Sequence, residues 1–337
     1  MVSDLISVAA QAGDFALYAL LPQLDAFFPL SSVIARVQNI AVPASKAVVA
    51  GRYEVGREGY IKTLEALQTS REVDEELRGW AISALHWGIG CIEAGLGRKD
   101  ALTHAEILNR VPVWRVPAWT IRRLYFMNVG NLREAERCRR QVELLLLQSP
   151  IKPPLFAGAA HQHVYAYVLL DNISGLRHAI VEMEAVSKSQ PSLAPFVPFT
   201  RGAHARACGN HADALKWFDQ TLSVVRPGEH PIWPWAASGR VHTLVGLERY
   251  SEARDYAMGA LVTADEIGLG IMRQHIEVAL ATAEAKLGDF AAACARLDAA
   301  AAAREGTPAS RRAVIATPRT NGESGRASCR ERVLCVV

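Results

Sequence analysis

Strand patterns, long apolar runs and a basic leader are all missing from this sequence. No segment shows the apolar and polar alternation, bounded by turns, that predicts a β-strand, which argues against an all-β or α/β fold. The richest apolar stretches, near residues 15–30 and 144–147, stop well short of the roughly 20 residues that a membrane-spanning helix needs. We therefore expect no membrane partner. Because no basic region precedes the first apolar stretch, we expect a cytoplasmic protein.

Paired cysteines and an excess of charge are also missing. The six cysteines form no Cys-x-x-Cys pair, and Cys91, Cys138, Cys208 and Cys294 each stand alone in a helical pattern, where a thiol is normally a small buried side chain. The net charge of +3 arises from residues 305–337, which carry six arginines and three glutamates, so residues 1–304 are neutral. A neutral body predicts no nucleic-acid partner.

The motifs of common catalytic sites are absent as well. We find no phosphate-binding GxxxxGK[ST], kinase glycine loop, catalytic HRD, GxSxG elbow or HExxH helix, and GLGRKDA from Gly95 has the wrong spacing for a phosphate loop. His161 and His163 are two residues apart, about 200 degrees around a helix, so they cannot bind one metal ion from one face. The sequence predicts no catalytic residue, no cofactor-binding residue and no metal ligand, and hence a chain that is not an enzyme.

What the sequence does contain is a repeat. The stretch GNHADALKWF from Gly209 recurs as GDFAAACARL from Gly288, GNLREAERCR from Gly130 and GRYEVGREGY from Gly51, with weaker copies from Asp171 and Glu248. The small-residue positions of five copies, 135, 176, 214, 253 and 293, are 41, 38, 39 and 40 residues apart. A near-constant period of this length predicts an array of helical repeats.

Each position of the copy has a mechanical role. The glycine ends one helix in a left-handed conformation, and the Asn or Asp beside it caps the next helix. Ala214 leaves room for the preceding helix, and Phe218 fills the space one turn later. We therefore expect paired helices near residues 31–69, 73–109, 112–148, 154–188, 195–225, 235–265 and 268–304.

The spacing of Gly202, Gly209, Ala214 and Phe218 resembles the tetratricopeptide (TPR) repeat over residues 31–304, with a period near 40 in place of the usual 34. The resemblance implies an all-α fold, a right-handed superhelical solenoid of TPR-like helix hairpins. Residues 1–30 are then an irregular helical lead-in. Residues 305–337 have no apolar period, and GRASCRERV from Gly325 resembles a translated sequencing-adaptor read, so we expect a disordered, non-native tail.

Long, degenerate repeats of this kind resemble the regulatory regions of large bacterial signalling proteins. LLPQLDAFFPLSSVIARV from Leu20 and LERYSEA from Leu247 are most similar to serine/threonine kinases that carry an ATPase module, and maltose-activator-type regulators are the second group. The resemblance implies a non-enzymatic binding or sensing scaffold, a fragment of a larger protein. The alternatives are the C-terminal part of such a kinase and the sensor region of a transcription regulator.

The resemblance also places a binding surface. In TPR hairpins the first helix lines the concave side through residues about 13, 10, 6 and 3 places before the turn. Counting back from the turns gives a predicted groove of His161, Tyr165, Phe199, Arg206, Trp235, His242 and His275, beside Phe196, Ser238 and Thr282. Such a wall suits a protein segment, an extended peptide or a small amphipathic ligand. Alternatively, the aromatic rings simply fill the space between helices.

Two further stretches have competing interpretations. Eight arginines between Arg110 and Arg140, interleaved with Trp114, Trp119 and Tyr125, suit RNA or an acidic peptide, yet nearby glutamates allow ion pairs along a solvated helix face, which we favour. The stretch RPGEHPIWPW from Arg226 is interpreted as a proline-stiffened connection whose tryptophans pack on neighbouring helices. The sequence leaves the oligomeric state open.

Overall fold

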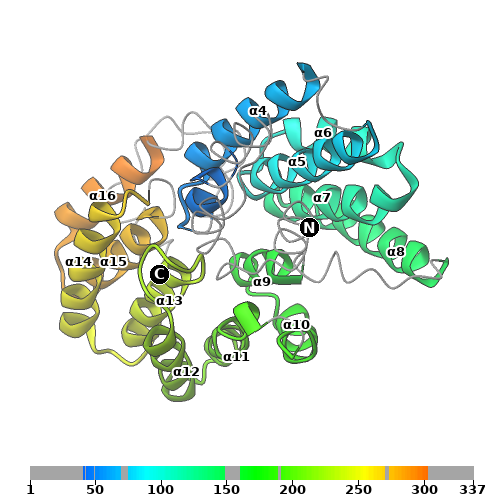
Figure 1. Cartoon of the computed structure of the whole chain (residues 1–337). Coiled ribbons are helices and arrows are strands. Elements are labelled where there is room, and N and C mark those ends of the chain that lie inside the picture. The colour runs from blue at the N-terminus through cyan, green and yellow to red at the C-terminus, as the bar shows by residue number, and fades with distance from the viewer. Residues whose placement is uncertain are drawn as a thin grey trace, which may run out of the picture. The chain divides into compact units, whose positions relative to one another are not determined.

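The structure is a computed structural model that describes residues 41, 43–48, 50–69, 75–148, 160–188, 191–269 and 273–302. Within these ranges the backbone consists of helices and turns, without a strand, so the predicted all-α class is confirmed (Figure 1). The expected lead-in and tail lie outside the described residues. The helices are α4 (Tyr53–Thr69), α5 (Glu75–Gly95), α6 (Asp100–Asn109), η1 (Pro112–Trp114), α7 (Arg115–Asn128), α8 (Leu132–Gln148), α9 (Ala160–Leu169), α10 (Ile173–Val186), η3 (Pro191–Leu193), α11 (Phe196–Ala207), α12 (His211–Val224), α13 (Trp233–Gly246), α14 (Tyr250–Glu266), α15 (Arg273–Lys286) and α16 (Phe290–Ala302).

Consecutive helices form hairpins, and all of the turns given below except that at Gly97 lie where the repeat places them. At each turn one residue has a positive φ, which closes the first helix. In the copies with glycine this costs nothing, but Asp171 and Glu248 adopt the same conformation with φ of 44° and 61°. The turn residues are Gly51, Gly97, Gly130, Asp171, Gly209, Glu248 and Gly288.

The predicted caps are present as well. The Asn210 side chain accepts a hydrogen bond from the backbone N–H of Asp213, and Asn131, Asn172 and Asp289 cap their helices with the same three-residue spacing. In the copy from Glu248, Arg249 occupies this position and makes no side-chain cap. A turn residue followed by a capping residue therefore fixes where most hairpins bend.

The small residue of each copy is buried where two helices meet. Ala135, Leu176, Ala214, Ala253 and Ala293 are at most 5% exposed. Phe218 is 1% exposed and fills the space beside Gly202 of the preceding helix, as predicted. The repeat therefore records the contact between the two helices of a hairpin.

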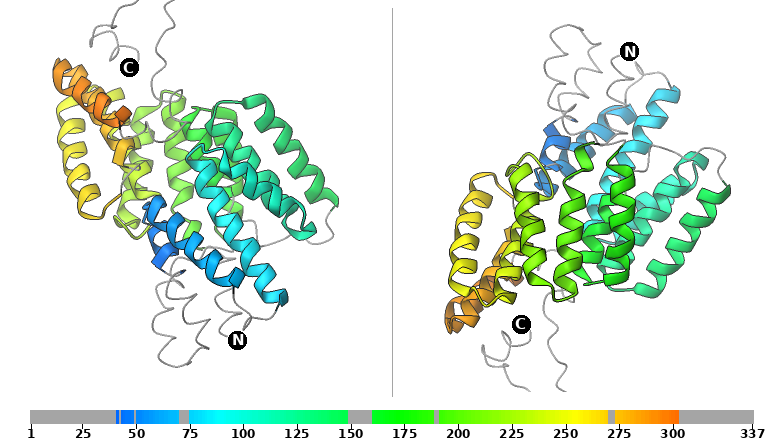
Figure 2. Two further views of the ribbon diagram at one scale, coloured as in Figure 1. Left: turned by 90° about the horizontal axis from the view of Figure 1, so that it is seen from above. Right: turned by 90° about the horizontal axis from the view of Figure 1, so that it is seen from below.

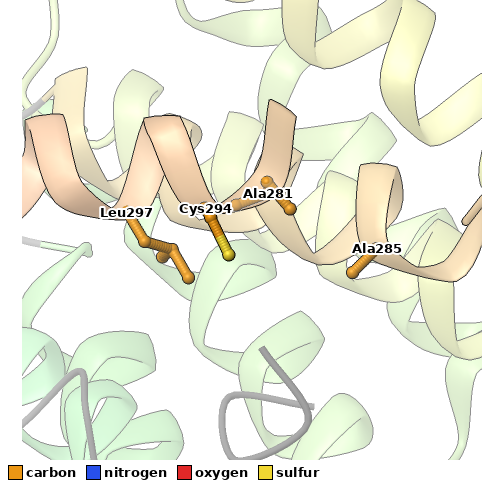
Figure 3. Close-up of a cluster of buried hydrophobic side chains, with 5 residues drawn as sticks. Ala281, Ala285, Cys294 and Leu297 are labelled. Carbon is orange, nitrogen blue, oxygen red and sulfur yellow. The ribbon is translucent and has the colours of Figure 1, made fainter. Parts of the chain in front are cut away.

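The chain divides into two compact units. The N-terminal unit comprises residues 1–166 and 182–194, and the C-terminal unit comprises residues 167–181 and 195–337. In the C-terminal unit α11, α12 and α13 lie side by side (Figure 2). Its last hairpin is closed by a small apolar cluster in which Ala281 and Ala285 of α15 meet Ala293, Cys294 and Leu297 of α16 (Figure 3).

Two sequence-based expectations are modified. The helix α13 begins at Trp233, two residues before the predicted start, because Pro234 occupies its first turn, where a missing N–H is tolerated. Trp233 and Trp235 are both buried, as expected for this connection. Cys208 is exposed rather than buried, since it follows the last residue of α11 at the open end of a turn. No helix among the described residues is long and apolar enough to cross a bilayer.

Candidate binding surface

In the C-terminal unit, the predicted groove residues on successive first helices meet one another. The ring of Trp235 on α13 stacks on His275 of α15, with centroids 4.2 Å apart and planes inclined by 33°. One turn after Trp235, the Ser238 hydroxyl donates to the backbone carbonyl of His275 at 3.0 Å. These contacts tie the N-terminal ends of two first helices together, and they place an indole and an imidazole next to each other.

A second contact joins the turn after α9 to α11. A guanidinium nitrogen of Arg206 lies 2.7 Å from a carboxylate oxygen of Asp171, which holds the cation in place. His242 on α13 is half-buried, and its burial, together with the positive charge of Arg206, lowers its pKa to about 3. At neutral pH the imidazole is therefore uncharged.

The aromatic members of the predicted groove are more buried than a lining residue would be. Phe199 is 1% exposed and packs against Phe218 with ring centroids 5.9 Å apart, so it fills the space between helices, as the alternative interpretation has it. Phe196, at 0% exposed, belongs to the same interior. Trp235 is 8% exposed, whereas Arg206, His242 and His275 are half-buried. The polar members thus reach the surface and the phenylalanines support it.

In the N-terminal unit, the predicted groove residues are His161 and Tyr165 of α9. Their rings meet edge to face with centroids 6.1 Å apart. Burial raises the pKa of Tyr165 well above its ordinary value, and the nearby Tyr53 adds to the shift. His163 is buried rather than on the surface, with its ring 3.4 Å from the Arg123 guanidinium. That both units line one groove stays a prediction.

The arginine-rich hairpin of α7 and α8 forms ion pairs along its own surface. Arg139 bonds Glu136 and Glu143, Arg140 bonds Glu136, and Arg137 approaches Glu134. The Arg122 guanidinium lies 4.6 Å from the Trp119 ring centroid and bonds Glu106 at 2.6 Å. These contacts confirm the interpretation of a solvated, ion-paired helix face.

A polar cluster lies inside the N-terminal unit, and no sequence motif predicts it. The Nδ1 atoms of His86 on α5 and His104 on α6 are 2.9 Å apart, so one ring donates and the other accepts. Burial lowers the pKa of both. Close by, the buried Glu93 carboxylate pairs with Arg57 and Arg98.

No motif marks these side chains, because they face each other only once α4, α5 and α6 have packed. Their roles are structural: they join facing helices. Within the described residues no group of three or more His, Cys, Asp or Glu side chains is arranged to hold a metal ion.

No protein-family model matches the chain, and no curated protein matches its sequence. Among solved structures it is similar to a Rap protein complexed with competence and sporulation factor, with 14% identity over 80% of this chain and 77% of that chain and a TM-score of 0.56. Two others, apo RapI and a tetratricopeptide repeat protein from Parabacteroides merdae ATCC 43184, share 12% identity over 81% and 79% of this chain and 77% and 92% of theirs, each with a TM-score of 0.44.

At these identities the likeness shows the fold alone, and we base the fold comparison on the Rap protein with the TM-score of 0.56. Together with the hairpins it confirms an all-α, TPR-like helical-repeat protein.

Proposed function

We propose that this chain is a non-enzymatic binding scaffold. Its ligand-binding surface lies on the first helices α11, α13 and α15 of the C-terminal unit. The observation that carries the proposal is the contact between groove residues on successive first helices: the Trp235 ring of α13 stacks on His275 of α15, and the Ser238 hydroxyl donates to the His275 carbonyl. Successive hairpins thereby contribute neighbouring side chains to one face, which is how repeat arrays build extended binding surfaces.

The chemistry of this face suits an extended peptide or a small amphipathic ligand. Arg206 supplies a cation that Asp171 holds in one position, and His242, uncharged at neutral pH, supplies one donor and one acceptor. The His275 ring, which is half-buried and backed by the buried Trp235, supplies contact area. The Rap protein of similar fold is complexed with a factor, which supports a binding role for such a fold.

We further propose that the chain is the regulatory part of a larger cytoplasmic signalling protein. Its sequence resemblance to kinase-linked repeat regions supports this context, and maltose-activator-type regulators are the alternative. Sequencing the coding region beyond this chain distinguishes them: a kinase or ATPase domain supports the first, and a DNA-binding helix-turn-helix supports the second.

The binding surface is tested with an array of immobilised synthetic peptides, followed by calorimetric titration of the best binder. We expect Arg206→Gln and His242→Ala each to weaken binding about tenfold, the size of effect that a central contact residue typically has. Arg254→Gln on the second helix α14, whose partner is the adjacent Asp255, is the matched control and should leave affinity unchanged.

Each outcome of this titration has a distinct meaning. Thermal melts of all variants confirm that they remain folded. If no peptide on the array binds, the scaffold function is wrong. If the control weakens binding as much as the other two, the function stands but the surface lies elsewhere.

A further inference from the structure

One end of the α7–α8 hairpin presents apolar side chains to solvent. Val111, just before η1, is 37% exposed, and Val113, within η1, is 70% exposed. Leu144 and Leu147 near the end of α8 are 51% and 83% exposed. Because α7 and α8 pack against each other and run antiparallel from the turn at Gly130, the last turn of α8 lies at the same end of the hairpin as η1 and the start of α7. We call these four residues, with Arg110 and Arg115, the hairpin-end patch.

The two arginines of the patch differ from Arg139 and Arg140 of α8. Arg139 and Arg140 are held by Glu136 and Glu143, as described above. By contrast, Arg110 and Arg115 are exposed, and no ion pair joins either of them to a residue that the structure describes. Their sequence, RVPVWR, places one uncompensated cation on each side of the two exposed valines, while Trp114 turns inward at 5% exposed.

We infer that the hairpin-end patch adsorbs to the surface of a bilayer containing anionic lipid. Apolar side chains that lie at the ends of helices and are 70% and 83% exposed project outward, as insertion into the boundary of headgroups and acyl chains requires. Arginines beside them are placed to meet lipid phosphate and carboxylate groups, which attract basic residues near the surface. The arginines of the patch therefore suit the anionic headgroup region, and its apolar side chains suit the acyl-chain region beneath it.

Adsorption of this kind differs from spanning. The lack of a spanning segment led the sequence analysis to expect no membrane partner, but an adsorbed protein needs only a protruding apolar tip and cations. The inference concerns a different surface from the proposed peptide-binding face. It does not depend on the proposed peptide-binding function.

The test is co-sedimentation of the full chain with vesicles of phosphatidylcholine containing about one-third phosphatidylserine, compared with vesicles of phosphatidylcholine alone. We expect binding to the anionic vesicles at low salt, and little binding at about 0.5 M salt, where screening shortens the reach of the arginines. Val113→Ser with Leu147→Ser should reduce the partition coefficient about tenfold, because two apolar side chains no longer enter the bilayer. Arg110→Gln with Arg115→Gln should reduce it to a similar extent, about tenfold.

The matched control is Met258→Ser with Val262→Ser. These residues are 49% and 59% exposed on α14, so the variant removes comparable exposed apolar surface from the C-terminal unit. The control should bind vesicles as the wild type does. Failure of the wild type to bind anionic vesicles, or unchanged binding by Val113→Ser with Leu147→Ser, overturns the inference. Concentration-dependent dimers that this variant abolishes, without vesicle binding, would instead assign the patch to a second copy of the chain.

Discussion

The ring of Phe218 on α12 lies directly against the backbone of Gly239 on α13, where a Cβ on the glycine would come within 2.6 Å of two ring carbons. The same ring touches Gly202 on α11, with corresponding distances of 3.2 Å. One aromatic side chain of a second helix is therefore packed against the first helices of two successive hairpins. The closer contact, at Gly239, leaves no room for a methyl group.

In the Gly239→Ala variant the added methyl forces Phe218 out of its position, at a cost of about 1 to 3 kcal/mol. Alanine gains roughly 1 kcal/mol over glycine in a helix, so the net free energy of unfolding should fall by up to about 2 kcal/mol. Urea denaturation measures both terms when Gly259→Ala is included as the control. Gly259 is also helical, but nothing lies within 4 Å of its Cβ position, so that variant should be stabilised by about 1 kcal/mol. Equal shifts in the two variants would contradict the packing argument.

Replacing the turn residue Glu248 with glycine should stabilise the protein. Its φ of 61° is unfavourable for a residue with a Cβ, and its side chain is exposed, so Glu248→Gly should raise the free energy of unfolding by about 1 kcal/mol. The comparison is Asp171→Gly, at φ of 44°, which relieves the same strain but removes the ion pair with Arg206. Denaturant titration should therefore show a smaller gain for Asp171→Gly. A loss of stability in Glu248→Gly would show that the turn is not strained.

The hairpins could be predicted from the sequence because their determinants are local. A residue with positive φ and a capping Asn or Asp act within a few positions, so Gly209 and Asn210 identify their turn without knowledge of the rest of the chain. Where the local signal is missing, as at Glu248 and Arg249, the spacing of about 40 residues between copies predicts the turn. The start of α13 was misplaced because Trp233 was counted with the proline-rich connection, although a proline in the first turn is itself a signal of a helix start.

The binding surface was only partly predictable, because burial depends on packing between helices. Counting back from the turns correctly brought Trp235 next to His275, since both occupy the same register of neighbouring first helices. It could not show that Phe199 is enclosed by Phe218, nor that Arg206 and burial together keep His242 uncharged. The pair of His86 and His104 likewise depends on two facing helices and has no mark in the sequence.

The absence of catalytic motifs leads to a prediction about activity. Because no phosphate loop, nucleophile with a base, or metal-ligand spacing is found in the sequence, the purified chain should neither hydrolyse ATP nor transfer phosphate. The measurement is a radiolabelled-ATP assay with a casein substrate and a preparation from cells lacking the expression plasmid as the blank. Phosphate transfer that disappears on substitution of a single residue of this chain would contradict the prediction.

The uncharged state of His242 predicts how stability depends on pH. Its pKa falls from 6.5 to about 3 in the folded chain, so between these values the unfolded chain binds a proton that the folded chain does not. The free energy of unfolding is therefore not reduced by His242 above about pH 6.5, and it falls progressively as the pH falls toward 3. His86 and His104 shift in the same direction and add to the loss. Urea titrations at neutral and acidic pH should show that His242→Gln loses less stability than the wild type, by about 1 to 2 kcal/mol near pH 4.5 after allowance for screening. Parallel losses in the two proteins would mean that His242 takes up its proton in the folded state.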